Sequence, residues 1–203
     1  LPGSGFDVNE VVKHANPTRD FNNIVLRMKA INPDIVIPAN YYNEYALLVR
    51  TMQQQKVSPK AIYSVLGGAA SSYKFVKEFP GAANGIIDCN HWFNPKDKRS
   101  AELRKRVEAQ GLFFSYEVFM TYTAMRLLAD AIERAKSPDR AAIIDALEKS
   151  TFSDHIMPYG STQFVNGQNT GAQPLMTQVL KGDIKVIIPR EYREAEPLFP
   201  LKA

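Results

Sequence analysis

The feature that most constrains this chain is the regular alternation of short apolar runs with amphipathic stretches through its first ninety residues. The runs at 33–38 and 60–66 are rich in β-branched residues, as strands covered on both faces are. The stretch between them, 43–56, has helical periodicity. Its apolar stripe consists of Tyr45, Leu48, Val49 and Met52. Strands and helices alternating at this spacing predict βαβ units on a parallel sheet, so the fold class is α/β.

The same alternation predicts further elements in this part of the chain. They are strands at 6–14 and 84–91, a helix at 19–32 with Asp20 as its N-cap, and a helix at 71–79 that ends at Pro80 and Gly81.

After residue 91 the pattern changes to longer helices and a β-rich end. Helices are expected at 95–111, at 115–136, and at 137–150 with Ser137 as N-cap and Pro138 in the first helical position. The helix at 115–136 carries too much apolar surface to stay uncovered. Its main stripe is Val118, Tyr122, Met125, Leu128 and Ile132. An Asn-Gly turn follows a short strand within 161–169, and residues 174–188 predict a hairpin about Lys181, Gly182 and Asp183.

Composition and charge exclude several classes of protein. The net charge of +4 is spread along the chain, and the one dense basic run, 96–108, has the pattern of a solvated helix face and not of a nucleic-acid site. No apolar run approaches the roughly 20 residues of a membrane helix. Cys89 is the only cysteine, so an internal disulfide is impossible. The chain begins with a pattern typical of a helix end, a glycine turn and a strand entry, which indicates a start inside a longer protein.

The histidines give no sign of metal or catalytic chemistry. His14, His91 and His155 are far apart, and none has a second ligand at metal-binding spacing. We therefore expect no catalytic residue, no metal and no cofactor.

Ligands of parallel α/β sheets bind beyond the carboxyl ends of the strands. Two segments are predicted to lie there. They are Asn40, Tyr41 and Tyr42 after the first run, and Leu66, Gly67 and Gly68 at the end of the second. A tyrosine offers a ring for stacking and a hydroxyl for hydrogen bonding, and glycines before a helix offer backbone N–H groups to an anion. The alternatives are that the tyrosines cover a helix start and that the glycines serve a tight turn.

Several stretches carry a resemblance to a known family. They are the run from DFNNIV to SVLGG (20–68), the run from SYEVFM to EKSTF (115–152), GSTQFVNGQNT (160–170) and MTQVLKGDIKVIIP (176–189). Their order resembles the type I periplasmic solute-binding proteins of ABC transporters, in particular the branched-chain amino acid group, over essentially the whole chain.

The resemblance implies a Rossmann-like, two-lobed fold of which this chain is about half. Residues 1–90 and 173–203 would form part of the second lobe, 91–172 part of the first, and a hinge would lie near 90–93. The missing N-terminal half would be supplied by the same chain or by another chain.

The resemblance also implies site residues. Tyr41 matches the tyrosine that touches the ligand in the family, and Tyr116 and Glu117 begin the helix that faces the cleft. The alternative for Tyr116 and Glu117 is that they only stabilise the start of the helix. Three residues at the proposed hinge, His91, Trp92 and Phe93, either line the cleft or pack between segments.

The implied function is that of a non-enzymatic protein, periplasmic or extracellular, that captures a small solute and delivers it to an ABC permease. Amino acid binders often place a carboxylate where this chain has Val65, Leu66 and Gly67, so an organic acid, including an aromatic one, fits better than a free amino acid. The alternatives are a ligand sensor or receptor with the same fold, and a flavodoxin-like enzyme. The enzyme predicts a cofactor or paired catalytic groups at the strand ends, and the sequence offers neither.

Overall fold

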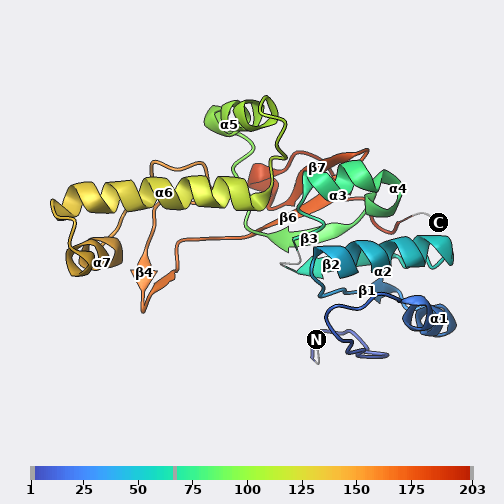
Figure 1. The fold of residues 1–203 in the computed structure, drawn as a ribbon. Coiled ribbons are helices and arrows are strands. Elements are labelled where there is room, and N and C mark those ends of the chain that lie inside the picture. The colour runs from blue at the N-terminus through green and yellow to red at the C-terminus, as the bar shows by residue number, and fades with distance from the viewer. Residues whose placement is uncertain (1–2, 66–67, 202–203) are drawn as a thin grey trace. The chain divides into compact units, whose positions relative to one another are not determined.

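The structure, a computed structural model, describes residues 3–65 and 68–201 (Figure 1). The chain divides into two compact units. The first unit consists of Leu1–Cys89, Thr177–Lys185 and Glu196–Ala203, and the second of Asn90–Met176 and Val186–Ala195. No helix in the described ranges is long and apolar enough to cross a membrane.

A sheet with the strand order β1-β2-β3-β6-β7 organises the fold (Figure 1). Its strands are β1 (Ile35–Val36), β2 (Ala61–Val65), β3 (Ile87–Asn90), β6 (Leu175–Leu180) and β7 (Asp183–Ile188). The first three are parallel, with Ile35 opposite Ala61 and Tyr63 opposite Ile87. The predicted α/β class with βαβ units is therefore confirmed.

Four helices of the first unit alternate with these strands. They are α1 (Asn22–Ile31), α2 (Tyr42–Gln54), α3 (Tyr73–Glu78) and α4 (Pro80–Ala83). Helix α2 is stabilised by burial of its apolar stripe in the core. All four predicted stripe residues, Tyr45, Leu48, Val49 and Met52, are buried. The Tyr45 hydroxyl also hydrogen-bonds Ser64 of β2, which fixes the helix to the sheet.

The second unit is mainly helical. Its elements are α5 (Lys98–Glu108), α6 (Tyr116–Ala135), α7 (Arg140–Glu148), β4 (Phe164–Val165), β5 (Gln168–Asn169) and the short 3-10 helix η1 (Arg190–Tyr192). The long helix α6 packs against α7 (Figure 1). Strands β4 and β5 form an antiparallel hairpin whose turn residues, Asn166 and Gly167, both have positive φ. This is the Asn-Gly turn that the sequence predicts.

Two predicted features of the first unit are wrong. Residues 6–14 form no strand, because no strand of the described chain pairs with their backbone. Val8 and Val11 are exposed. Pro80 does not merely end α3 but begins α4, since proline is well tolerated in the first helical turn.

Two predicted helix starts are also shifted. The N-cap of α7 is Asp139 and not Ser137, because the Asp139 carboxylate accepts hydrogen bonds from the backbone N–H groups of Ala141 and Ala142. Phe21 holds the cap position of α1, although the Asp20 carboxylate still accepts a hydrogen bond from the Asn22 N–H at 2.8 Å.

The apolar stripe predicted for α6 is not its buried side. Met125 is 60% exposed and Ile132 42%, whereas Phe119, Thr123 and Ala131 are buried. The helix packs inside its unit through this second stripe. In the predicted stripe, Val118, Tyr122 and Leu128 are half-buried, and Met125 and Ile132 remain exposed.

Candidate functional site

The carboxyl ends of β1 and β2 lie at one edge of the sheet, because the two strands are parallel neighbours. A depression of about 570 Å³ lies at this edge, and we call it the strand-end depression. Its lining includes Asn40 and Tyr41, which follow β1, and Val65, which ends β2. The loop before α1 contributes Lys13 and His14, and α2 contributes Glu44.

Asn40 connects the strand end to the preceding loop. Its side-chain amide donates to Nε2 of His14 at 2.6 Å. That bond assigns the ring proton to Nδ1, which donates to the Ala15 carbonyl at 2.8 Å. The His14 ring also packs edge-on against Phe21 at 5.1 Å. Asn40 and His14 therefore form one connected part of the wall.

The two adjacent tyrosines have different surroundings. Tyr41 is 75% exposed and lines the depression. Tyr42 donates its hydroxyl proton to Glu78 of α3 at 2.9 Å and packs edge-on against Phe75. Burial and the Glu78 carboxylate raise the pKa of Tyr42. Tyr42 thus fastens α2 to α3, while Tyr41 is available to a ligand.

Glu44 is the wall residue that the sequence analysis missed. It is the third residue of α2 and only 6% exposed, and it lines the depression. Within the described chain its carboxylate makes no hydrogen bond or ion pair. The sequence feature that could have identified Glu44 is its position in the first turn of a helix that starts at a strand end, three residues after Tyr41.

Two of the three residues predicted at the end of β2, Leu66 and Gly67, lie outside the described residues. Gly68 has a φ of +74°, in the left-handed region that favours glycine, so the turn requires its backbone freedom.

The remaining predicted site residues belong to the second unit. Tyr116 is half-buried and Glu117 exposed at the start of α6. Trp92 is fully buried and stacks on Phe93 at 5.2 Å, and both rings contact Phe119 edge-on. These two residues pack among the aromatic side chains of their own unit, while His91 is half-buried beside them.

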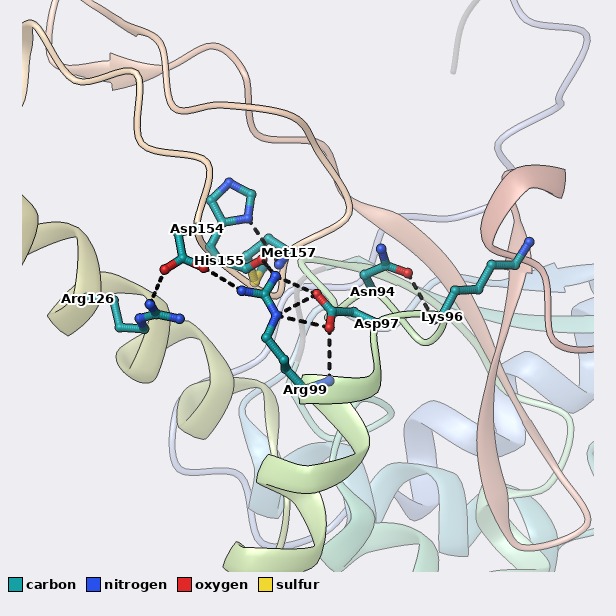
Figure 2. A network of polar contacts seen from close by, with 8 residues as sticks. All are labelled: Asn94, Lys96, Asp97, Arg99, Arg126, Asp154, His155 and Met157. Atoms are coloured by element: carbon teal, nitrogen blue, oxygen red, sulfur yellow. Dashed lines mark hydrogen bonds and ion pairs between the residues drawn. The ribbon is translucent and has the colours of Figure 1, made fainter.

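An arginine network joins three segments of the second unit (Figure 2). The Arg99 guanidinium donates to Asp97 through Nε and Nη2, to Asp154 through Nη1 at 2.5 Å, and to the His155 carbonyl at 2.8 Å. Arg126 of α6 donates to the other oxygen of Asp154. Partial burial opposes the shift, but the charges of Arg126 and Arg99 lower the pKa of Asp154.

Asp154 and Arg126 line a second depression, of about 490 Å³, beside α6. We call it the α6 depression. Its wall contains two ion pairs, because Arg126 contacts Asp154 and Arg134 contacts Asp130 at 2.8 Å. Among the described residues, no group of three or more histidine, cysteine or acidic side chains is arranged to hold a metal ion.

Comparison with family profiles assigns this chain to one family. Residues 1–183 match the sequence profile of the periplasmic binding protein family. Comparison with curated protein sequences gives no significant match.

Three solved structures are similar in fold. A leucine-binding protein from Thermotoga maritima has a TM-score of 0.70 and 23% identity, over 86% of this chain and 49% of that one. A branched-chain amino acid binding protein from Streptococcus pneumoniae, in complex with isoleucine, has a TM-score of 0.69 and 19% identity, over 87% and 51%. A solute-binding protein of an ABC transporter from Rhodopseudomonas palustris, in complex with benzoate, has a TM-score of 0.74 and 14% identity, over 89% and 49%.

The chain therefore spans about half the length of the solved structures that it matches. These relatives are solute-binding proteins and not enzymes. On the match over residues 1–183, which accounts for most of its length, this chain belongs to the periplasmic binding protein family.

Proposed function

We propose that the full-length protein captures a small organic solute, an amino acid or a carboxylic acid, at the strand-end depression and delivers it to an ABC importer. The observation that carries this proposal is the depression itself. It lies at the carboxyl ends of two parallel strands, where α/β sheets bind ligands, in a chain of this family.

The wall of the depression suits a small polar solute. Tyr41 offers an exposed ring, Asn40 and His14 offer a hydrogen-bonded polar pair, and Lys13 and Glu44 carry opposite charges. Specific sites commonly combine contact area from aromatic rings with a few polar groups that fix orientation. The similar structures include a leucine-binding protein and complexes with isoleucine and with benzoate, which fits the two solute classes proposed.

Delivery requires partners that this chain does not contain. We propose a periplasmic or extracellular location, a membrane permease as partner, and an N-terminal half from the same chain or another. We also propose that the two units belong to the two lobes of the family fold, joined near 90–93. The exposed apolar stripe of α6, with Met125 and Ile132, supports a missing partner, because exposed apolar patches mark interaction surfaces.

Titration calorimetry of the full-length protein with leucine, isoleucine and benzoate tests solute binding. We expect at least one of them to bind, and Tyr41→Ala to weaken that binding about tenfold through lost contact area. Tyr42→Phe is the matched control, because the Tyr42 hydroxyl is already bonded to Glu78. It should change affinity less than about twofold. Absence of binding, or a larger loss for Tyr42→Phe than for Tyr41→Ala, would contradict the proposal.

A further inference from the structure

Asp88 is a buried carboxyl group to which the proposed function assigns no role. It lies in β3, it is 1% exposed, and its Oδ2 accepts a hydrogen bond from the Ser71 hydroxyl. Its other oxygen, Oδ1, is buried without a hydrogen bond of normal geometry in the described chain. Burial disfavours the charged form of such a group and raises the pKa of Asp88 to about 6, although Ser71 and the backbone N–H of Cys89 act to lower it.

The neighbours of Asp88 lie directly behind the wall of the strand-end depression. Ser64 of β2 is opposite Asp88 in the sheet, and the Ser64 hydroxyl hydrogen-bonds Tyr45 of α2. Ser64 is fully buried and the next residue, Val65, is exposed, because successive side chains of a strand point to opposite faces. Val65 and Glu44, the residue before Tyr45, line the depression. One position along each element therefore separates the surroundings of Asp88 from the proposed solute site.

Asp88 also holds the segment that follows β2. Ser71 lies in this segment, three residues after Gly68, whose positive φ shapes the turn at the strand end. A hydroxyl can donate to a carboxylate and can accept from a protonated carboxyl group. Ser71 can therefore bond either form of Asp88, so that the segment stays attached while the charge of Asp88 changes.

The groups that face Asp88 carry no positive charge to oppose its protonation. On one side β6 contains no acidic or basic residue, and α4 contains none either. Tyr45 of α2 and Tyr63 of β2 interact electrostatically with Asp88, and burial raises the pKa of both hydroxyls, so they stay neutral near pH 7. Glu44 of α2 is another acid. The charged side chains of α3 are exposed, namely Lys74, Lys77 and Glu78.

We propose that Asp88 takes up a proton from the solvent when the solute binds, so that solute affinity rises as the pH falls from about 7.5 to about 5.5. This inference rests on the proposed function and adds a regulation of the same site. Both proposed solute classes carry a carboxylate, whose charge disfavours a second negative charge behind the wall. Covering the depression also removes water from the front of the wall, which disfavours that charge further.

The direction of the effect follows from linkage. If the bound solute raises the pKa of Asp88, the protonated protein binds the solute more tightly by the same factor. The affinity is then highest at the acidic end, where Asp88 carries its proton before the solute arrives. It falls as the pH rises, because the proton must then be taken from solution during binding.

Calorimetry of the full-length protein in buffers of different ionisation enthalpy tests the inference, because the buffer supplies the proton. The probes are leucine, isoleucine and benzoate, which keep one charge state between about pH 5.5 and 7. For a probe that binds, we expect uptake of about 0.3 to 0.5 proton per solute near pH 6.5. Its affinity should be about three- to sixfold higher at about pH 5.5 than at about pH 7.5.

Two variants separate Asp88 from the other group that can take up a proton. In Asp88→Asn the amide oxygen can still accept from Ser71, but the side chain no longer titrates. This variant should bind without proton uptake, and its affinity should change less than about twofold over the same pH range. His14 lines the depression, and histidine titrates in this range. His14→Gln should therefore retain the proton uptake, whatever its effect on affinity.

A second measurement needs no variant. Carbon-13 NMR of the wild type, labelled at the aspartate carboxyl carbon, follows Asp88 directly, and saturating solute should raise the pH at which it titrates. Binding without proton uptake, uptake that His14→Gln abolishes and Asp88→Asn retains, or a titration of Asp88 that solute leaves unchanged would overturn the role of Asp88 and leave solute binding intact. If the wild type bound none of the three probes, the proposed function and this inference would both fail.

Discussion

Two depressions, one in each unit, have acidic residues in their walls, and Asp154 of one differs from Glu44 of the other in exposure and in partners. Asp154, in the α6 depression, is largely exposed and meets two arginines, Arg99 and Arg126 (Figure 2). Glu44, in the strand-end depression, is almost fully buried and meets none. The acid that water can solvate has protein partners, whereas the acid that most needs a partner lacks one.

The difference supports the proposal that the α6 depression is structural and that the strand-end depression binds the solute. The charges around Asp154 pair with one another, so a solute that entered the α6 depression would have to compete with existing ion pairs. An uncompensated polar group is costly for folding, and such costs are typical of functional sites.

The largest expected effect on stability concerns Asp88. This third acid is buried, as Glu44 is, but it has a hydrogen-bond partner, as Asp154 does. It is buried in β3 and accepts a hydrogen bond from Ser71. Burial raises the pKa of Asp88 to about 6, against the hydrogen bonds that lower it. A raised native pKa means that the folded state holds a proton which the unfolded chain releases near pH 4. The contribution of Asp88 to the free energy of unfolding should therefore fall by about 2 to 3 kcal/mol as the pH rises from about 4 to about 6.

Urea unfolding of the full-length protein and of Asp88→Asn across this range measures that contribution. Asp88→Asn should not show this pH-dependent fall in the free energy of unfolding. His155 acts with the opposite sign, because burial lowers its pKa, so only the difference between the two proteins isolates Asp88. Asp97 and Asp154 have lowered pKa values and lose their contribution below about pH 4. A difference that stays constant with pH would show that Asp88 is not protonated in the native protein.

Arg99 tests the paired side of the comparison. Arg99→Ala removes the hydrogen bonds to Asp97, Asp154 and the His155 carbonyl, and should lower the free energy of unfolding by about 2 kcal/mol. Lys149→Ala is the control, since Lys149 pairs only with Asp145 on the surface of α7 and should cost less than about 0.5 kcal/mol. Equal losses of stability for Arg99→Ala and Lys149→Ala in chemical denaturation would show that the arginine network is no more than a surface contact.

Elements whose formation depends on local pattern could be predicted from the sequence. The stripe of α2, the Asn-Gly turn and the alternation of strands and helices all follow from periodicity and turn chemistry, and the structure confirms them. Residues 6–14 have a strand-like sequence but form no strand, because a strand requires a partner. The stripe of α6 was misassigned because Phe119, Thr123 and Ala131 are the buried residues of this helix, whereas Met125 and Ile132 of the predicted stripe are exposed.

The depression could be predicted in position, but the charges in its wall could not. Asn40 and Tyr41 line a depression at the predicted strand end. The different orientation of Tyr42 depends on Glu78, thirty-six residues away, which no local pattern reveals. Glu44 was missed because a glutamate in a first helical turn is ordinary in sequence, and only its burial without a partner makes it unusual.

Neutralising the two acids should change stability in opposite directions when no solute is bound. Glu44→Gln removes a buried, unpaired charge and should raise the free energy of unfolding by about 1 kcal/mol, even after loss of the helix-dipole interaction. Asp154→Asn removes an exposed, doubly paired charge and should lower it by about 0.5 to 1 kcal/mol. Chemical denaturation of both variants measures the direction of each change in the free energy of unfolding. A loss of stability in Glu44→Gln equal to that in Asp154→Asn would show that Glu44 is already compensated.

Salt gives the smallest and most selective test, because screening acts on exposed charges far more than on buried ones. In about 1 M NaCl the stability difference between the wild type and Asp154→Asn should shrink by about half or more, to below about 0.5 kcal/mol. The difference for Glu44→Gln should stay nearly constant, since its effect comes from desolvation of one buried group and not from attraction across solvent. The same sensitivity to salt at both positions would mean that water reaches Glu44 as freely as Asp154, and the contrast between the two depressions would then be lost.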